Sequence, residues 1–282
     1  MGRKRSALNL CLLKVSGYDF PSPMSDKFKR IILKFGSGIL ARRDGRGLDS
    51  AQFARLTTQV AQLVKRGHEC VVVSSGAVAA GLGVLGLKER PEDQANLQAC
   101  AAVGQSKLMQ FYETNFARHK LHVAQLLVTH GDIDSRMRGA NVKHTLDRLL
   151  ASKIVPIINE NDSVAVEELK FGDNDRLSAE VAMLAHADLL ILLTSVDGLM
   201  DARGQIVPVV ADVDSVAKLA NASRGKFSVG GMVSKLQAVK AAVEAGIPTA
   251  IANGRKAAQI GAIVAGRRAG TRFLAKGESA SL

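Results

Sequence analysis

The sequence has no tryptophan, and aromatic residues make up only 4% of it. Its three cysteines, Cys11, Cys70 and Cys100, are odd in number and widely spaced. This spacing fits neither a disulfide framework nor a zinc site, and it favours a reducing compartment. No run of eighteen apolar residues occurs, so no membrane span is predicted. We therefore expect a cytoplasmic protein that does not bind a membrane.

Familiar phosphate-binding motifs are also missing. The chain has no G-x-x-x-x-G-K-[ST] loop and no H-R-D or D-F-G set of the protein kinases. Gly36-Ser37-Gly38 superficially matches the dinucleotide fingerprint. However, the next predicted strand ends in Ser74-Ser75, where that fingerprint requires an acid for the ribose. Phosphate transfer by this chain would need another architecture.

The net charge of +12 is concentrated at the two ends of the chain. Residues 1–34 carry eight Lys and Arg against two acids, and residues 254–282 carry six against one. The body between them has 24 basic and 23 acidic residues. Nucleic-acid binding needs a basic stripe on one folded face, so no nucleic-acid partner is expected.

Apolar runs and amphipathic stretches alternate along most of the chain. The predicted strands are Arg30–Phe35, Cys70–Val73, Val123–Leu127, Val155–Ile158, Leu189–Leu193 and Thr249–Ile251. The predicted helices are Ser50–Arg66, Ala95–Arg118, Arg138–Leu150, Arg176–Ala185, Val233–Ala245 and Ala257–Ala265. Such alternation predicts an α/β fold, a three-layer α/β/α sandwich with a largely parallel central sheet. Ligands of such sheets bind beyond the carboxyl ends of the strands.

Two clusters of amides and carboxylates flank one short segment in the middle of the chain. Asn159-Glu160-Asn161-Asp162 follows a predicted strand, and Asp173-Asn174-Asp175 precedes a predicted helix. Both clusters have an alternative interpretation as turn and helix-cap chemistry, with Asp175 as the N-cap. Two such clusters so close together favour a site for a small polar molecule, because an amide beside a carboxylate can hold an ammonium group.

Two lysines are placed to face an anion. Lys34 lies inside the first predicted strand, where burial is costly unless its ammonium emerges at the strand end. Lys235 follows Val229-Gly230-Gly231-Met232-Val233-Ser234, and glycines before a helix let backbone N–H groups approach a phosphate. The alternatives are a solvated lysine in the first case and a flexible glycine turn in the second.

Two further strand ends carry small or polar residues. Ser75 begins a Gly- and Ala-rich stretch that extends to Gly81, which favours either a nearby ligand or tight helix packing. Thr194 and Ser195 follow the apolar strand Leu189–Leu193 and precede the ordinary turn pair Asp197-Gly198.

The run I-N-E-N-D-S-V-A and the run N-D-R-L-S-A from Asn174 resemble the glutamate 5-kinases of the amino acid kinase superfamily. The resemblance covers roughly Arg30 to Ala252. It implies the amino acid kinase fold and ATP-dependent phosphorylation of the L-glutamate side chain, the first step of proline biosynthesis. It departs from the family pattern at Ser195 and Met200, where the family usually has Asp and Tyr, so the adenine and ribose contacts are open.

The resemblance also implies roles for individual residues. Lys34, Lys235 and Asp175 would be catalytic, with Asp175 orienting the two lysines. Substrate binding would fall to Ser75, Asp162 and Asn174. The ATP-binding residues would be Lys34, Thr194, Ser195, Val229, Gly230, Gly231, Met232, Val233, Ser234 and Lys235. No protein metal ligand is expected, and Mg²⁺ would accompany ATP. The six histidines are scattered, and we interpret them as incidental.

The resemblance extends to organisation and partners. Residues 1–25 would be a flexible extension, with Met24 as an alternative start, and residues 26–282 one kinase domain. About 26–170 would bind the acceptor and about 171–282 the nucleotide. A homo-oligomer is expected, with the product passing to glutamate-5-semialdehyde dehydrogenase. The chain ends too early for the PUA domain found in many relatives. The alternatives are an acetylglutamate or carbamate kinase, and a non-catalytic glutamate or proline sensor.

Overall fold

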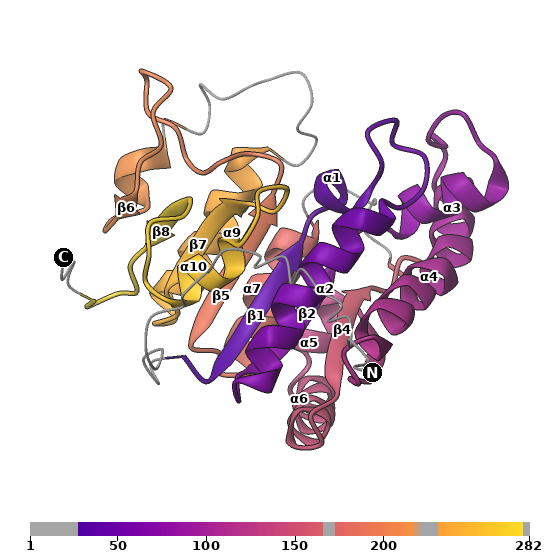
Figure 1. Ribbon diagram of the computed structural model, residues 1–282, viewed down its shortest axis with the longest axis horizontal. Coiled ribbons are helices and arrows are strands. Elements are labelled where there is room, and N and C mark those ends of the chain that lie inside the picture. The colour runs from indigo at the N-terminus through magenta and orange to yellow at the C-terminus, as the bar shows by residue number, and fades with distance from the viewer. Residues whose placement is uncertain (1–27, 166–172, 218, 220–230, 279–282) are drawn as a thin grey trace, which may run out of the picture.

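The computed structural model describes residues 28–165, 173–217, 219 and 231–278 of the chain. The predicted N-terminal extension therefore lies outside the described residues, as do Val229 and Gly230 of the glycine segment. The figures draw these parts as a thin grey trace (Figure 1).

A single eight-stranded sheet runs through the described part of the chain, in the order β3-β4-β2-β1-β5-β7-β8-β6. Every described pairing is parallel except β7 with β8. The strands are β1 (Arg30–Phe35), β2 (Glu69–Ser74), β3 (Val123–Val128), β4 (Val155–Glu160), β5 (Leu189–Thr194), β6 (Val209–Val210), β7 (Thr249–Asn253) and β8 (Thr271–Phe273). The predicted parallel sheet is confirmed, and β1 lies at its centre.

Helices connect most of these strands. They are α1 (Ser37–Leu40), α2 (Ser50–Lys65), α3 (Ala77–Leu85), α4 (Gln94–Ala117), α5 (His130–Asp134), α6 (Arg136–Ala151), α7 (Asp173–Leu184), the 3₁₀ turn η1 (Asp214–Val216), α9 (Met232–Glu244) and α10 (Gln259–Val264). The first long helix begins as its sequence predicts, because the Asp49 side chain accepts a hydrogen bond from Gln52 N at 3.1 Å.

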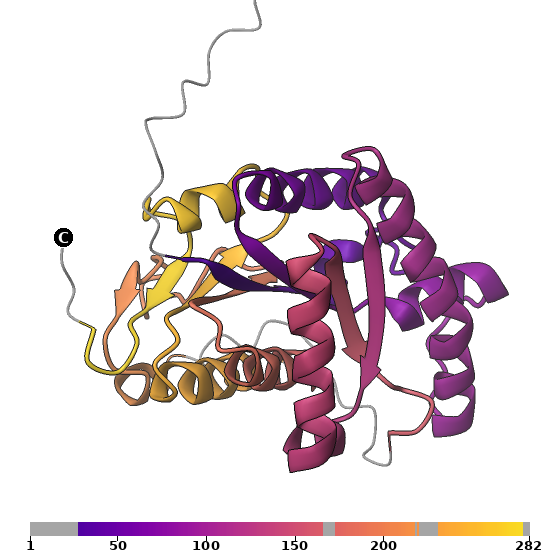
Figure 2. The same cartoon turned by 90° about the horizontal axis from the view of Figure 1, so that it is seen from below.

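The sheet is buried on both faces, which gives the predicted three layers (Figure 2). One apolar core contains Leu33 and Phe35 of β1 together with side chains of α2, α4 and α10. The opposite core contains Ile32 of β1 with side chains of α6, α7 and α9. Because side chains alternate along a strand, Lys34 must point to the same face as Ile32, toward α7 and α9.

Two predicted element boundaries are wrong in an informative way. β4 continues two residues beyond Ile158, since Asn159 and Glu160 pair with Leu127 and Val128 of β3. α7 begins at Asp173 rather than Arg176, so Asp175 lies inside its first turn and is not the N-cap. In both places polar residues that are typical of turns belong to a regular element.

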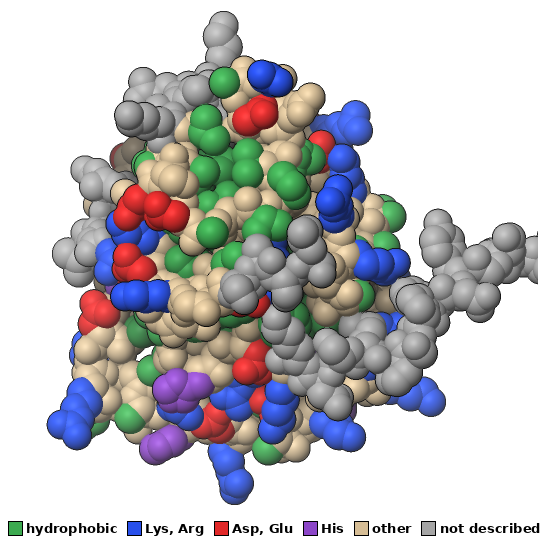
Figure 3. All heavy atoms as spheres, turned by 90° about the vertical axis from the view of Figure 1, so that its left-hand side faces the viewer, with side chains coloured by type: hydrophobic (Ala, Val, Ile, Leu, Met, Phe, Trp, Pro, Cys, Tyr) green, Lys and Arg blue, Asp and Glu red, His purple; other side chains and the backbone are tan. Residues whose placement is uncertain are grey.

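Apolar side chains are exposed on the side of the molecule where β6 and β8 lie (Figure 3). Met200, Ile206 and Val209 are the exposed large hydrophobic residues of this part of the chain, at 37 to 45% relative exposure.

In the part of the chain that the structure describes, no helix is long and apolar enough to cross a membrane.

The helices α3 and α4 meet through glycine. A Cβ atom on Gly104 would lie 1.8 Å from Ala77 O, and one on Gly81 would lie 2.0 Å from Cys100 O. Both distances are far below van der Waals contact, so the two backbones touch directly. The Gly- and Ala-rich stretch after Ser75 therefore serves tight helix packing, one of the two alternatives that the sequence left open.

Gly104→Ala should destabilise the protein by about 1–3 kcal/mol or more, because the added methyl group must push two backbones apart. Urea denaturation measures this loss. Gly261→Ala is the matched control, since nothing lies within 4 Å of its Cβ position in α10. There the change should be neutral or stabilising by up to about 1 kcal/mol. Equal stability of the two variants would contradict the close packing.

Candidate active site

The polar residues of interest gather where neighbouring parallel strands end. Lys34 of β1 is flanked in the sheet by Val73 of β2 and Leu192 of β5. Ser74 is the last residue of β2 and Ser75 follows it, and Asn159 and Glu160 are the last two residues of β4. All of these strands run parallel, so their carboxyl ends share one edge, where ligands of such sheets bind.

A buried carboxylate joins the two predicted lysines. Asp175 Oδ1 lies 2.6 Å from Lys34 Nζ, and Asp175 Oδ2 accepts a hydrogen bond from Lys235 Nζ at 3.0 Å. The three residues are 1 to 9% exposed. They come from β1, α7 and α9, so segments about 200 residues apart in the sequence meet at one carboxyl group.

The charges of this cluster do not cancel. Two ammonium groups and one carboxylate leave one surplus positive charge in a buried place. Burial lowers the pKa of Lys34, Asp175 opposes this, and Lys235 lowers it further. Burial alone would raise the pKa of Asp175, but the two lysines outweigh it and hold that pKa below its usual value. The cluster is electrostatically suited to an anion.

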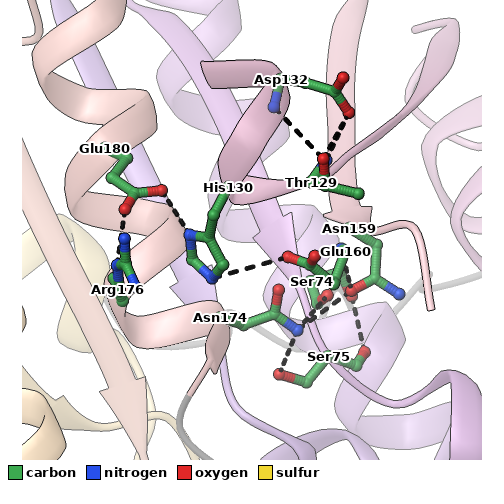
Figure 4. Close-up of polar contacts among 10 residues, drawn as sticks. All are labelled: Ser74, Ser75, Thr129, His130, Asp132, Asn159, Glu160, Asn174, Arg176 and Glu180. Carbon is green, nitrogen blue, oxygen red and sulfur yellow. Dashed lines mark hydrogen bonds and ion pairs between the residues drawn. The ribbon is translucent and has the colours of Figure 1, made fainter. Parts of the chain in front are cut away.

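A second cluster is made of neutral side chains around Asn174 and Asn159, which Figure 4 shows pointing toward one another and toward Ser74 and Ser75. Asn174 Nδ2 donates to Ser74 O and Ser75 Oγ, both at 3.2 Å, and to Asn159 Oδ1 at 3.0 Å. Asn159 Nδ2 donates in turn to Gln105 Oε1 of α4 at 2.9 Å. Since Asn174 and Asp175 are consecutive residues, the first turn of α7 belongs to both clusters.

Glycine brings backbone close to Lys34. Gly36 N donates to Leu193 O at 3.1 Å, and a Cβ atom on Gly36 would lie 3.6 Å from Lys34 Nζ. A Cβ atom on Gly38 would lie 3.6 Å from the exposed Ser195. Thr194 and Ser195 therefore stand at the strand end next to the turn that follows Lys34.

Arg255, which follows β7, forms hydrogen bonds to the backbone of α1 and of the residue after it. Arg255 donates to Gly38 O at 2.9 Å and to Ala41 O at 2.8 Å. It also lies 3.6 Å from Asp49. The position of α1 thus depends on a residue more than 200 positions away.

The remaining predicted site residues fall into three groups. Gly231 caps α9, and Met232, Val233 and Ser234 form its first turn, with Ser234 Oγ donating to Gly231 O at 3.0 Å. Asp162 lies half-buried in the turn after β4; burial lowers the pKa of Arg90 below its usual value, and the charge of Asp162 opposes this only in part. Val229 and Gly230 lie outside the described residues.

Some residues of this edge have no predicted role. Gln105 and Asn159 both belong to the amide cluster, and neither is among the predicted site residues. His130 was interpreted as incidental, yet its Nδ1 lies 2.6 Å from Glu180 Oε2 and its Nε2 lies 3.9 Å from Glu160 Oε2. Its place directly after the strand β3 was the available signal, because strand ends converge on one edge.

The described residues contain no group of three or more His, Cys, Asp or Glu side chains that could hold a metal ion. Both oxygens of Asp175 already face lysines. The described residues around Asp175 therefore do not fit a Mg²⁺ site built from protein ligands.

The Lys34–Asp175–Lys235 cluster lies at the carboxyl edge of a central parallel sheet, where ligands of such sheets bind. The family model described as the amino acid kinase family matches residues 29–253. The chain belongs to the amino acid kinase family.

Within that family, the similar curated proteins are glutamate 5-kinases. The chain is 45% identical over 260 residues to the glutamate 5-kinase of Geobacter sp. (strain M21), covering 90% of this chain and 69% of the relative. It is 43% identical over 265 residues to that of Geobacter sulfurreducens, covering 92% of this chain and 71% of the relative.

Solved structures with low sequence identity share the fold. N-acetylglutamate synthase from Neisseria gonorrhoeae, complexed with coenzyme A and N-acetyl-glutamate, superposes with a TM-score of 0.66 at 14% identity. That match covers 90% of this chain but only 60% of the synthase. UMP kinase from Bacillus anthracis gives a TM-score of 0.58 at 14% identity, over 88% of this chain and 96% of that one.

Asp175→Asn should destabilise the protein by about 3–5 kcal/mol, because two buried ammonium groups lose the carboxylate that both of them contact. Denaturant unfolding measures the effect. The control is Asp214→Asn, since Asp214 lies 2.6 Å from Lys240 on the exposed surface. That pair should contribute little. A loss for Asp175→Asn no larger than for the control would show that the buried carboxylate is not needed to hold the lysines.

Proposed function

We propose that the chain phosphorylates the side-chain carboxylate of L-glutamate with ATP, giving L-glutamyl 5-phosphate, the first step of proline biosynthesis. The observation that carries this proposal is the buried cluster of Lys34, Asp175 and Lys235 with its surplus positive charge. The identity of 45% to glutamate 5-kinases over 90% of the chain supports the choice of acceptor.

The reaction itself needs no general base. The glutamate side chain is an ionised carboxylate at neutral pH. One of its oxygens attacks the γ-phosphorus of ATP, the bond from that phosphorus to the β,γ-bridging oxygen breaks, and ADP leaves with the electron pair. Since no proton is transferred, the protein has to position two anionic reactants and neutralise the charge between them.

The two lysines supply this neutralisation. Both ammonium groups are held by Asp175, so they are fixed before the substrates bind and need little reorganisation during the transfer. In this proposal Lys34 and Lys235 contact the transferring phosphoryl group from two sides. Asp175 orients them and takes no proton.

The acceptor lies beside the amide cluster, where Ser75, Asn174 and Asp162 hold the amino acid. The nucleotide lies at the ends of β5 and α9, with its phosphates at the segment from Val229 to Lys235 and at Thr194 and Ser195. In this proposal about 26–170 is mainly the acceptor half and about 171–282 mainly the nucleotide half, with Asn174 and Lys34 each contributing across the division. Mg²⁺ would enter with the phosphates of ATP and neutralise part of their charge.

The cellular setting follows from the same proposal. We expect a cytoplasmic homo-oligomer whose partners are small molecules rather than nucleic acid or membrane. An acyl phosphate hydrolyses readily, so the product would pass to a glutamate-5-semialdehyde dehydrogenase.

An acceptor panel tests the activity. The purified protein is incubated with ATP, Mg²⁺ and hydroxylamine, which traps an acyl phosphate as a hydroxamate. Glutamate should give hydroxamate together with ADP, whereas N-acetylglutamate, aspartate and carbamate should give neither. Turnover of N-acetylglutamate in preference to glutamate, or no turnover of any acceptor, would overturn the proposed reaction.

Lys235→Met should lower kcat about 10²–10³-fold and change glutamate binding little, because the lysine acts on the transferring charge. Steady-state kinetics with both substrates separates the two effects. Lys240→Met is the control, since Lys240 lies on the same helix α9 but is exposed. Unchanged kcat in Lys235→Met would remove this lysine from the mechanism.

A further inference from the structure

One backbone N–H fixes the orientation of Asn159, and through it the orientation of Gln105. Glu160 N donates to Asn159 Oδ1 at 2.9 Å, and a backbone N–H can only donate. The oxygen of Asn159 is therefore fixed on that side. Its Nδ2 must then face Gln105, at 2.9 Å, so Gln105 presents its oxygen to Asn159.

The same logic orients Asn174. Asn159 Oδ1 also receives Asn174 Nδ2 at 3.0 Å, and that nitrogen lies 3.2 Å from Ser74 O, a carbonyl that can only accept. A flipped Asn174 would place oxygen against oxygen at both contacts. The polarity of the chain Gln105–Asn159–Asn174 is thus set by backbone groups alone.

With the three amides in these orientations, one hydrogen-bond donor and one acceptor have no partner. Gln105 Nε2 and Asn174 Oδ1 are buried and have no hydrogen-bond partner in the described structure. Such orphaned groups cost roughly 1–3 kcal/mol each, so their presence at a ligand-binding edge calls for a partner. The donor stands at one end of the three-amide chain and the acceptor at the other.

We propose that these two atoms recognise the zwitterionic end of the acceptor amino acid. Gln105 Nε2 donates to the α-carboxylate, and Asn174 Oδ1 accepts from the α-ammonium. Gln105 is then a specificity-determining residue for a free α-amino acid, held in its orientation by Asn159. This inference rests on the proposed function, since the acceptor is glutamate bound beside the phosphoryl site.

Gln105→Glu tests the assignment with little change of shape. One carboxylate oxygen still accepts from Asn159 Nδ2, and the other replaces the donor with an acceptor that repels the α-carboxylate. The KM for glutamate should rise about tenfold or more, while the KM for ATP stays within about twofold. Gln110→Glu adds the same charge to the exposed side of α4 and should change neither KM.

An analogue that lacks the α-carboxylate separates recognition from structure. The inhibition constant of 4-aminobutyrate against glutamate is measured for both proteins. It should be nearly equal in the wild type and in Gln105→Glu. A glutamate KM that does not change, or an equal weakening of glutamate and 4-aminobutyrate, would overturn the role of Gln105.

A binding measurement and a second variant distinguish failure of this inference from failure of the proposed function. Glutamate-dependent thermal shifts report binding without activity, so a wild-type protein that binds glutamate but transfers no phosphate rejects the proposed function and still decides on Gln105. A wild-type protein that does not bind glutamate rejects both. If Gln105→Glu does not fold, Gln105→Asn withdraws the donor without adding charge and is measured in the same way.

Discussion

The active-site edge depends on one buried carboxylate that two lysines share. Asp175 is 1% exposed and contacts Lys34 and Lys235 within 3.0 Å. A buried ion is tolerated only when opposite charges and hydrogen bonds compensate it, so β1, α7 and α9 must meet at this point for any of the three groups to be charged. Two amino groups therefore share one carboxylate where three separate elements of the fold meet. In the proposed function, a phosphate bound there would place further negative charge beside the two lysines.

The six longer strands follow from the sequence because their signal is local, whereas their order in the sheet was not predicted. β1 and β5 are buried on both faces, which requires nearly continuous apolar runs, and these runs predicted the strands within a residue. The first turn of α7 was misassigned for the opposite reason. Asp and Asn favour caps and turns unless a distant charge attracts them, and the partners of Asp175 are more than 50 residues away in the sequence. Likewise β6 has two residues and is defined only by its pairing with β8.

The two lysines of the candidate site could be predicted from the sequence, whereas the roles of the amides Gln105 and Asn159 could not. A lysine within an apolar strand and a lysine after two glycines are anomalies that a reader of the sequence can see. Gln105 lies on the long helix α4 among ordinary helix residues, and Asn159 looks like the start of a turn. Their roles depend on hydrogen bonds to β4 and α7, so no local pattern marks them. His130 was missed similarly, because its partner Glu180 lies on another element.

The lysine–aspartate cluster is built of charged side chains and the amide cluster of neutral ones. The chemistry of the proposed reactants explains this difference. The transferring phosphoryl group and the attacking carboxylate are net anions, so ammonium groups stabilise them across a short distance. The α-amino and α-carboxylate groups of an amino acid cancel each other in net charge. A buried charged side chain opposite either one would itself need a counter-charge, whereas oriented amides offer one donor and one acceptor without it. In the proposed complex the net charge of glutamate would reside on its side chain, and the amides and lysines lie next to each other because Asn174 and Asp175 are consecutive residues of α7.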